Sequence, residues 1–338
     1  MSWLECVKNF GVLVSHLEVP SLESWLCEIT KIREGQYVAG QNKDLKSNVE
    51  EWLSKEGYSL EFSTANVFRR AGFKVSQGQY VRDSVADTAR DIDVSARRDR
   101  HTENVILRIE NVVECKWSKD RPWVIFSSND PIPSSACIAQ TIGSDLGQNL
   151  LWLSSNDPFL HGTNHFYTPE RPGFSGRQAL NSGKDLFYSA MQSVTSTASL
   201  LAKQYDFIPV PPFTLPKLAV IVFPVIVVQG QLFEAFYDEG NEKVILEQVG
   251  RMRLHWRGSE SYVLNATVDI VSADDLDAFA NERASEVTKV LDSLEGSFNL
   301  IDECYKTHSL NPIKELKKTS LPPLLNIIKL FEQQHNQD

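Results

Sequence analysis

The sequence predicts an α/β protein: a mixed central sheet flanked by helices, with an N-terminal helical region and C-terminal helices. Apolar residues at helical spacing alternate along the chain with short runs of β-branched and apolar residues typical of strands. Residues 218–228 form the most apolar stretch, which suits a buried central strand. With 338 residues, of which 42% are hydrophobic, the chain has ample material for a core.

We expect three parts. Residues 1–44 form an N-terminal helical cap, with Asp44 capping a further helix that ends near Lys55. Residues 45–271 form the main domain, interrupted at 127–182 by an insertion rich in Ser, Asn, Pro and Gly. Residues 272–338 add C-terminal helices that pack on this core.

In the first half of the main domain, Ser59 is the expected N-cap of a helix that runs to Arg70 and stops at Gly72. The longest expected strand, over residues 105–117, is either continuous or interrupted by a hairpin or a bulge at Asn111. The expected strands lie at residues 73–75, 79–81, 89–94, 105–117 and 123–126.

The second half continues the alternation. We expect most of the insertion to be loop, apart from one helix. Helices are expected at 136–153, 183–204, 272–294 (capped by Ser272) and 321–334, and strands at 218–228, 232–237, 244–249 and 262–271.

Composition excludes several classes of protein. The net charge of −10 argues against a surface coated for nucleic acid, although residues 59–126 hold 12 Lys and Arg against 10 Asp and Glu. That local balance allows a polyanionic substrate.

No signal peptide is visible, and the apolar stretches are too short for a membrane span. Five scattered cysteines show neither zinc spacing nor a disulfide framework, so we expect a reducing, cytoplasmic setting.

Charged residues recur inside two of the predicted strands. Asp91 and Asp93 are two residues apart and are expected on one face of their strand. By the same alternation, Glu114 and Lys116 share a face while Cys115 points to the other. Carboxylates gathered across adjacent strands are costly unless something compensates their charge, and a bound divalent cation would do so.

Glu61, near the start of the preceding helix, can approach Asp93 and Glu114 if that helix packs beside the two strands. Three carboxylates with water suit Mg²⁺, and Mn²⁺ is expected to substitute. A bound Mg²⁺ would activate a water molecule and neutralise charge on a phosphate. Lys116 could hold or deprotonate that water.

These residues resemble the PD-(D/E)XK nuclease superfamily, which has the restriction-endonuclease-like fold. The resemblance rests on Glu61 in an opening helix, Asp93 after an apolar residue, and the unit Glu114-Cys115-Lys116. The resemblance covers roughly residues 45–230 at the level of the fold, although only about 70 of these residues carry the motif. No proline precedes the aspartate, which departs from the family pattern.

The resemblance implies a Mg²⁺-dependent nuclease that hydrolyses phosphodiester bonds, with DNA as the expected substrate and a role in restriction, repair or anti-phage defence. It also implies that Gln192, on the helix after the core strands, contributes to the active site. A homodimer or a protein partner is compatible with it. The alternative is a catalytically silent nuclease-like fold that binds nucleic acid or a protein.

Other interpretations of these charges stay open. The strand charges could form a solvated cross-strand ion pair, and Glu61 could only favour its helix terminus. Asp91 could be a second metal ligand or a partner of Arg90 or Arg108. Basic residues around the motif are candidate phosphate contacts, namely Arg69, Arg70, Lys74, Arg97, Arg98 and Lys119.

Overall fold

The chain divides into two units, Met1–Glu56 and Gly57–Asp338. In the described part of the first unit, the computed structural model gives the helix α2 (Gln36–Lys55). It begins well before Asp44, so the predicted cap there is wrong, and the expected boundary after residue 44 falls inside this helix. The structure describes residues 36–55, 57–83, 88–118, 121–155, 157–162, 166, 170–180, 185–206, 217–260, 263–309 and 311–314.

The second unit is built on a mixed sheet of 11 strands. The predicted mixed α/β architecture, with a large sheet flanked by helices, is therefore confirmed. Along the sheet the order is β1 (Lys74–Ser76), β4 (Val94–His101), β5 (Val105–Trp117), β9 (Lys217–Gln229), β13 (Val263–Ser272), β12 (Arg251–Glu260), β8 (Gly173–Gln178), β6 (Trp123–Ser127), β10 (Leu232–Asp238) and β11 (Lys243–Gln248), and the short β7 (Ile142–Gly143) pairs with β9.

The centre of the sheet is the pair β5 and β9, which run parallel in unbroken register from Val105 opposite Lys217 to Trp117 opposite Gln229. On its other edge β5 pairs antiparallel with β4. The strand predicted over 105–117 is therefore continuous, with neither a hairpin nor a bulge at Asn111. The predicted central position of residues 218–228 is confirmed.

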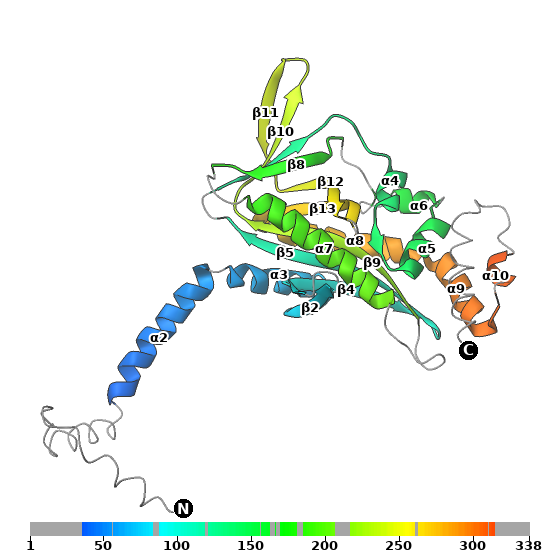
Figure 1. Ribbon diagram of the computed structural model, residues 1–338, viewed down its shortest axis with the longest axis horizontal. Helices are drawn as coiled ribbons and strands as arrows, with labels where there is room; N and C mark the ends of the chain where they lie inside the picture. The colour runs from blue at the N-terminus through cyan, green and yellow to red at the C-terminus, as the bar shows by residue number, and fades with distance from the viewer. Residues whose placement is uncertain are drawn as a thin grey trace, which may run out of the picture. The chain divides into compact units, whose positions relative to one another are not determined.

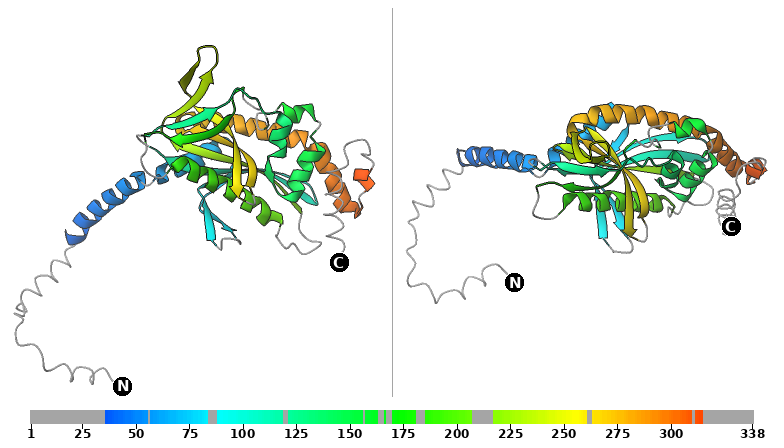
Figure 2. Two further views of the ribbon diagram at one scale, coloured as in Figure 1. Left: turned by 45° about the horizontal axis from the view of Figure 1, so that its top comes forward. Right: turned by 90° about the horizontal axis from the view of Figure 1, so that it is seen from above.

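Helices cover both faces of this sheet. On one face α3 (Tyr58–Arg70), α5 (Asp145–Leu153), α8 (Leu276–Ser293) and α9 (Glu295–Thr307) share a hydrophobic core with alternate residues of β5 and β9. The opposite face is covered by α7 (Leu186–Asp206), as the right-hand view of Figure 2 shows. The remaining helices are short: α4 (Ser134–Ala139), α6 (Pro158–His161), α10 (Asn311–Lys314) and the 3₁₀ turn η1 (Ala273–Asp275).

The segment 127–182 contains more structure than predicted. The helix expected over 136–153 is two helices, α4 and α5, separated by strand β7. Ser144, just after the break, has one local contact and one distant contact. Ser144 caps α5 by accepting a hydrogen bond from the backbone N–H of Gly147, and its Oγ also accepts one from Val220 N–H on β9. Further along, β8 joins the central sheet between β6 and β12, so this segment is part of the core.

Several predicted ends move. Helix α3 begins at Tyr58 after Gly57, whose φ of 85° suits glycine, so Ser59 lies inside the helix and is not its cap. Its end at Gly72 is confirmed by the positive φ of 87° there. Strand β12 and helix α9 were not predicted. The helix expected over 321–334 lies outside the described residues.

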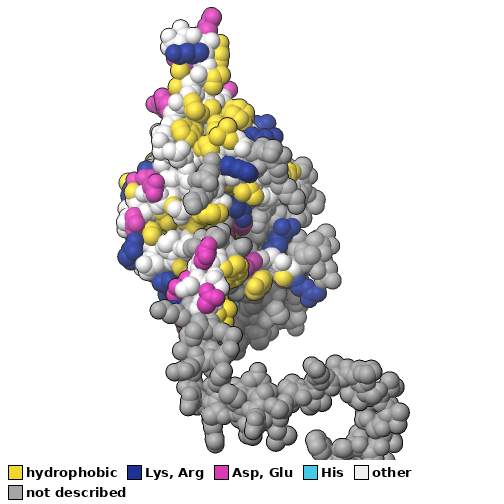
Figure 3. All heavy atoms as spheres, turned by 90° about the vertical axis from the view of Figure 1, so that its left-hand side faces the viewer, with side chains coloured by type: hydrophobic (Ala, Val, Ile, Leu, Met, Phe, Trp, Pro, Cys, Tyr) yellow, Lys and Arg dark blue, Asp and Glu magenta, His cyan; other side chains and the backbone are white. Residues whose placement is uncertain are grey.

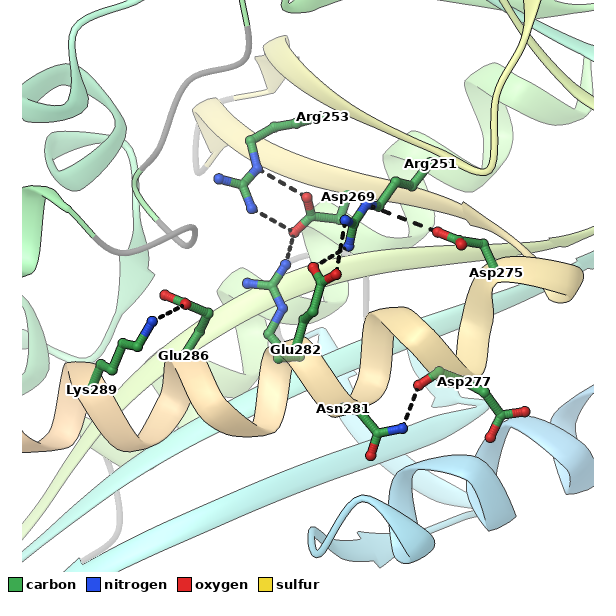
Figure 4. A network of polar contacts seen from close by, with 10 residues as sticks. Arg251, Arg253, Asp269, Asp275, Asp277, Asn281, Glu282, Glu286 and Lys289 are labelled. Carbon is green, nitrogen blue, oxygen red and sulfur yellow. Dashed lines mark hydrogen bonds and ion pairs between the residues drawn. The ribbon is translucent and has the colours of Figure 1, made fainter.

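A buried ionic network fixes α8 to the sheet. Asp269 of β13 accepts hydrogen bonds from Arg253 of β12 at 2.9 and 3.3 Å, and it also pairs with Arg283 of α8. Figure 4 shows this group beside the more exposed pair of Arg251 and Glu282. Since Asp269 and Arg283 are both buried, each compensates the charge of the other.

None of the described helices is both long and apolar enough to cross a membrane.

Candidate active site

The predicted aspartate strand is broken at Asp93. Residues before it form β3 (Thr88–Ile92), which pairs only with β2 (Gln79–Asp83) in a separate two-stranded sheet, and residues after it form β4. Asp93 occupies the bend between the two. Asp91, in β3, is exposed, so the expectation that both aspartates share one strand face is wrong. Arg108, one suggested partner of Asp91, pairs with Asp99 at 2.8 Å.

The bend delivers Asp93 to the Glu-Cys-Lys strand. Val94 lies opposite Val113 in the ladder between β4 and β5. One Oδ of Asp93 accepts a hydrogen bond of 2.7 Å from the backbone N–H of Cys115. The aspartate is therefore held beside the backbone that separates Glu114 from Lys116, by a hydrogen bond that a charged acceptor strengthens.

Glu114 and Lys116 lie on the same face of β5, as the alternation predicted, and form an ion pair. Glu114 is buried, with 8% of its surface exposed, and Lys116 is half-buried. The second carboxylate oxygen of Glu114 accepts a hydrogen bond of 2.9 Å from the hydroxyl of Ser193 on α7. Both oxygens of Glu114 are thus engaged, which compensates the cost of burying its charge.

Glu61 lies in the first turn of α3 and is half-buried. Its pKa is raised by burial and by the negative charges of Asp91 and Glu114, while Lys116 acts in the opposite direction. The charges that act on Glu61 therefore come from β3 and β5, and its membership of the site stays a prediction.

The same crowding of carboxylates acts on Asp93. Burial, the charge of Glu114 and the charge of Glu61 raise its pKa to about 7, against the opposing effects of the Cys115 N–H and Lys116. Burial alone would lower the pKa of Lys116, but the charge and hydrogen bond of Glu114 outweigh burial and raise it. Lys116 is therefore an ammonium at neutral pH, which disfavours the predicted option that it deprotonates a water molecule.

The three acids fit a hard divalent cation by their chemistry. Glu61, Asp93 and Glu114 supply only carboxylate oxygens, and their mutual repulsion is the condition that a cation would relieve. In their present arrangement, no group of three His, Cys, Asp or Glu side chains among the described residues is close enough to hold a metal ion. Glu114 instead takes Lys116 and Ser193 as partners.

Ser193 of α7 contacts Glu114, and it was not predicted as a site residue. Gln192, the predicted contributor, donates a hydrogen bond of 3.0 Å to the Tyr188 hydroxyl one turn earlier, and its role at the site stays a prediction. A signal for Ser193 was present in the sequence. It follows Ala190 by three residues and adjoins Val194, both of which are buried against the sheet.

Cys115 points away from the acids, as predicted. Its side chain packs at the edge of the core under α3, with Sγ 3.7 Å from the hydroxyl oxygen of Thr64. Burial and the nearby charge of Asp93 raise its pKa well above that of a free thiol, so it is an unreactive small apolar residue.

The predicted phosphate contacts divide by environment. Arg98 donates to the carbonyl oxygens of Ala284 and Ala71 at 2.9 and 2.8 Å, so it joins β4 to α8 and α3 rather than facing solvent. Exposed Arg70 pairs with Asp277 at 2.6 Å. The other described candidates, which remain predictions, are Arg69 and Lys74, both exposed, and half-buried Arg97; Lys119 lies outside the described residues.

Comparison of this chain with protein-family models, with curated proteins and with solved structures found no match.

Proposed function

We propose that this chain is a Mg²⁺-dependent nuclease of the PD-(D/E)XK kind, with the restriction-endonuclease-like fold, that hydrolyses phosphodiester bonds in DNA. One observation carries the proposal: the hydrogen bond from the Cys115 N–H to Asp93. It unites the bend aspartate with Glu114 and Lys116, residues that are 21 and 23 positions away in the chain. Electrostatic coupling adds Glu61 from α3 to the same group.

Each residue then has a distinct role. Asp93, Glu114 and Glu61 would hold the cation through their oxygens, and Asp93 would first have to lose the proton that its raised pKa favours. Ser193 orients Glu114 through its hydroxyl. We assign to the ammonium of Lys116, beside Glu114, the role of holding the attacking water and stabilising the negative charge that develops on the phosphate. When bound, Mg²⁺ supplies a Lewis acid and lowers the pKa of water.

The burial of these charged groups favours a functional site over the alternative of a solvated cross-strand ion pair. Cross-strand ion pairs on a sheet surface are exposed and contribute little. Here Glu114 is buried and Asp93 and Lys116 are half-buried, so these charges are held at a cost in solvation that a bound cation would offset. Residues 59–126, which hold all four groups, also carry a small excess of basic residues in a chain of net charge −10.

The test is cleavage of plasmid, linear duplex, single-stranded DNA and RNA by the wild type and by Lys116→Ala, each with Mg²⁺ or with EDTA. We expect Mg²⁺-dependent cleavage of DNA by the wild type and a loss of at least about 100-fold in the variant, the usual effect of removing one group that stabilises a transition state. Circular dichroism of the variant checks that it remains folded.

Lys289→Ala is the matched control, because Lys289 also pairs with a nearby glutamate, Glu286, but on α8. It should cleave as the wild type does. Equal rates for Lys116→Ala and the wild type, or cleavage unaffected by EDTA, would remove this site from the reaction. Absence of cleavage on all four substrates, together with tight DNA binding, would favour the catalytically silent alternative.

A further inference from the structure

The hairpin of β10 and β11 stands out from the body of the second unit, at the top of Figure 1 and again in the left-hand view of Figure 2. Within the sheet, β10 is paired on both sides, with β6 and with β11. Strand β11 ends the order of strands, so among the described residues it pairs with β10 alone. Its outer edge therefore presents backbone N–H and C=O groups that another strand could bind.

The hairpin is well formed up to its tip. Six consecutive residue pairs join the two strands, from Phe233 opposite Gln248 to Asp238 opposite Lys243. At the turn, the Asp238 carboxylate accepts hydrogen bonds from the backbone N–H groups of Gly240 and Asn241 at 2.9 and 3.3 Å. The edge is thus held in shape before any partner arrives, which lowers the entropy lost on binding.

Apolar side chains on this edge face solvent. Val244 is 70% exposed, Leu246 is 57% exposed, and Tyr237, directly opposite Val244, is 52% exposed. Residues opposite one another in a ladder lie on the same face, so these three form one apolar surface. Figure 3 shows hydrophobic side chains along this projecting part of the molecule. Exposed apolar edge strands are rare in natural proteins unless they bind another chain.

Charge identifies the kind of partner. Residues 232–248 contain five acidic residues and one basic residue, Lys243. Arg171 pairs with two of these acids, Glu234 and Glu247, and the remaining acidic excess disfavours a phosphate backbone as the partner. The partner that remains is a protein strand. Two copies of β11 that run antiparallel are complementary to one another, since its sequence is Lys243-Val244-Ile245-Leu246-Glu247-Gln248.

We propose that β11 pairs antiparallel with β11 of a second copy of this chain, in the register that places Ile245 opposite itself. In this register Lys243 of each copy lies opposite Glu247 of the other, which gives two ion pairs across the interface, each beside the Arg171 that pairs with Glu247 in its own chain at 3.4 Å. Val244 of each copy lies opposite Leu246 of the other, so the two apolar surfaces continue into one. A parallel pairing in register would instead set Lys243 against Lys243 and Glu247 against Glu247.

The arrangement joins the central sheets of two copies at their β11 edges. It also separates the acidic hairpin tips, because antiparallel strands carry them in opposite directions. This inference does not depend on the proposed nuclease activity. If both hold, the assembly has two active sites, as cleavage of both strands of a duplex requires.

The first test is the mass in solution, measured by light scattering on a dilution series of the full chain. The wild type should show a dimer that dissociates on dilution. Lys243→Glu and Glu247→Lys each set like charges opposite one another twice, so each should weaken the dimer by about tenfold or more. Mixed together, the two variants are complementary and should restore the dimer. A monomeric wild type at every concentration, or a mixture no more associated than its components, would overturn the proposal.

The second test fixes the register. Ile245→Cys places two thiols opposite one another, within about 5.5 Å between their Cβ atoms, and mild oxidation should link the two copies. Val244→Cys is the matched control and should not crosslink. In this register the two cysteines at position 244 lie diagonally across the strands, about 7–8 Å apart. The wild type under the same oxidation controls for the native cysteines. Equal crosslinking of both variants, or of neither, would exclude this register.

Discussion

The raised pKa of Asp93 leads to a prediction that needs no substrate. Asp93→Asn keeps a side-chain oxygen that can accept the hydrogen bond from the Cys115 N–H, but it carries no charge beside Glu114 and Glu61. If repulsion among the acids is real, this loss should stabilise the metal-free protein. Most substitutions at a buried polar residue destabilise, so the expected sign is unusual.

The magnitude follows from linkage. The ordinary pKa of 3.8 applies to Asp93 in the unfolded chain, and the folded pKa is about 7. Between these values the folded state binds more protons than the unfolded state, so the stability of the wild type falls as pH rises. At 1.36 kcal/mol per unit, the ceiling over about three units is ~4 kcal/mol. We expect Asp93→Asn to gain about 2–4 kcal/mol relative to the wild type between pH 4 and pH 8.

Urea unfolding of both proteins in EDTA, at several pH values across this range, measures the difference. Asp99→Asn is a control of opposite sign. Burial alone would raise the pKa of Asp99, but the hydrogen bonds and charge of Arg108 outweigh it and lower the pKa. Asp99→Asn should therefore be less stable than the wild type at neutral pH, by an amount that shrinks on acidification below about pH 4.

The reasoning fails if the difference between Asp93→Asn and the wild type is flat across the pH range, or if it shrinks as pH rises. Either result would mean that Asp93 is not crowded by the other acids. A constant offset added to a difference that still grows with pH would not count against it, because the substitution also changes packing.

Three further predictions concern the support of the site and of the fold. Ser193→Ala removes the hydroxyl that holds Glu114, so kcat for DNA cleavage should fall about tenfold while the free energy of unfolding changes by no more than about 1 kcal/mol. Arg283→Met leaves Asp269 only partly compensated and should cost about 3 kcal/mol in urea unfolding. Gly147→Ala would place a Cβ 2.1 Å from the carbonyl oxygen of Val220, and thermal unfolding should show a loss of about 3 kcal/mol.

Each of these has a matched control in the same kind of element. Ser189→Ala, on the outer side of α7, should leave kcat unchanged. Arg251→Met breaks an exposed pair and should cost less than about 1 kcal/mol. Gly296→Ala adds a Cβ in open space on α9 and should be neutral or stabilising. An effect in a control as large as in its test variant would show that the named contact is not the cause.

The parts of the fold that the sequence predicted are those in which one signal dominates. The apolar run of β9 needs burial on both faces, and only a central strand provides that. The alternation in β5 placed Glu114 and Lys116 on one face because the period of a strand is fixed by its backbone. The stripe of α7 was equally clear, since its apolar residues recur every three or four positions.

The failures have a common cause, which is the influence of distant residues on local structure. Ser144 caps α5 while its hydroxyl oxygen also accepts a hydrogen bond from Val220, on a strand far along the chain. The break at Asp93 arises because Cys115 supplies a backbone donor there. Ser193 could be ranked as a site residue only once α7 was known to lie over Glu114. The contacts of Ser144 and Asp93 leave no periodic signal in the sequence, and the stripe of α7 shows that Ser193 faces the sheet but not which residue it contacts.

The most direct test of the central claim is calorimetric titration of the metal-free protein with Mn²⁺ and Mg²⁺ at several pH values. The account predicts one tight site per chain, affinity that rises from pH 6 to pH 8 as Asp93 loses its proton, and at least a tenfold loss in Asp93→Asn. Asp277→Asn, which removes an exposed acid paired with Arg70, should bind as the wild type does. Binding by Asp93→Asn equal to that of the wild type would show that these carboxylates do not form a common cation site.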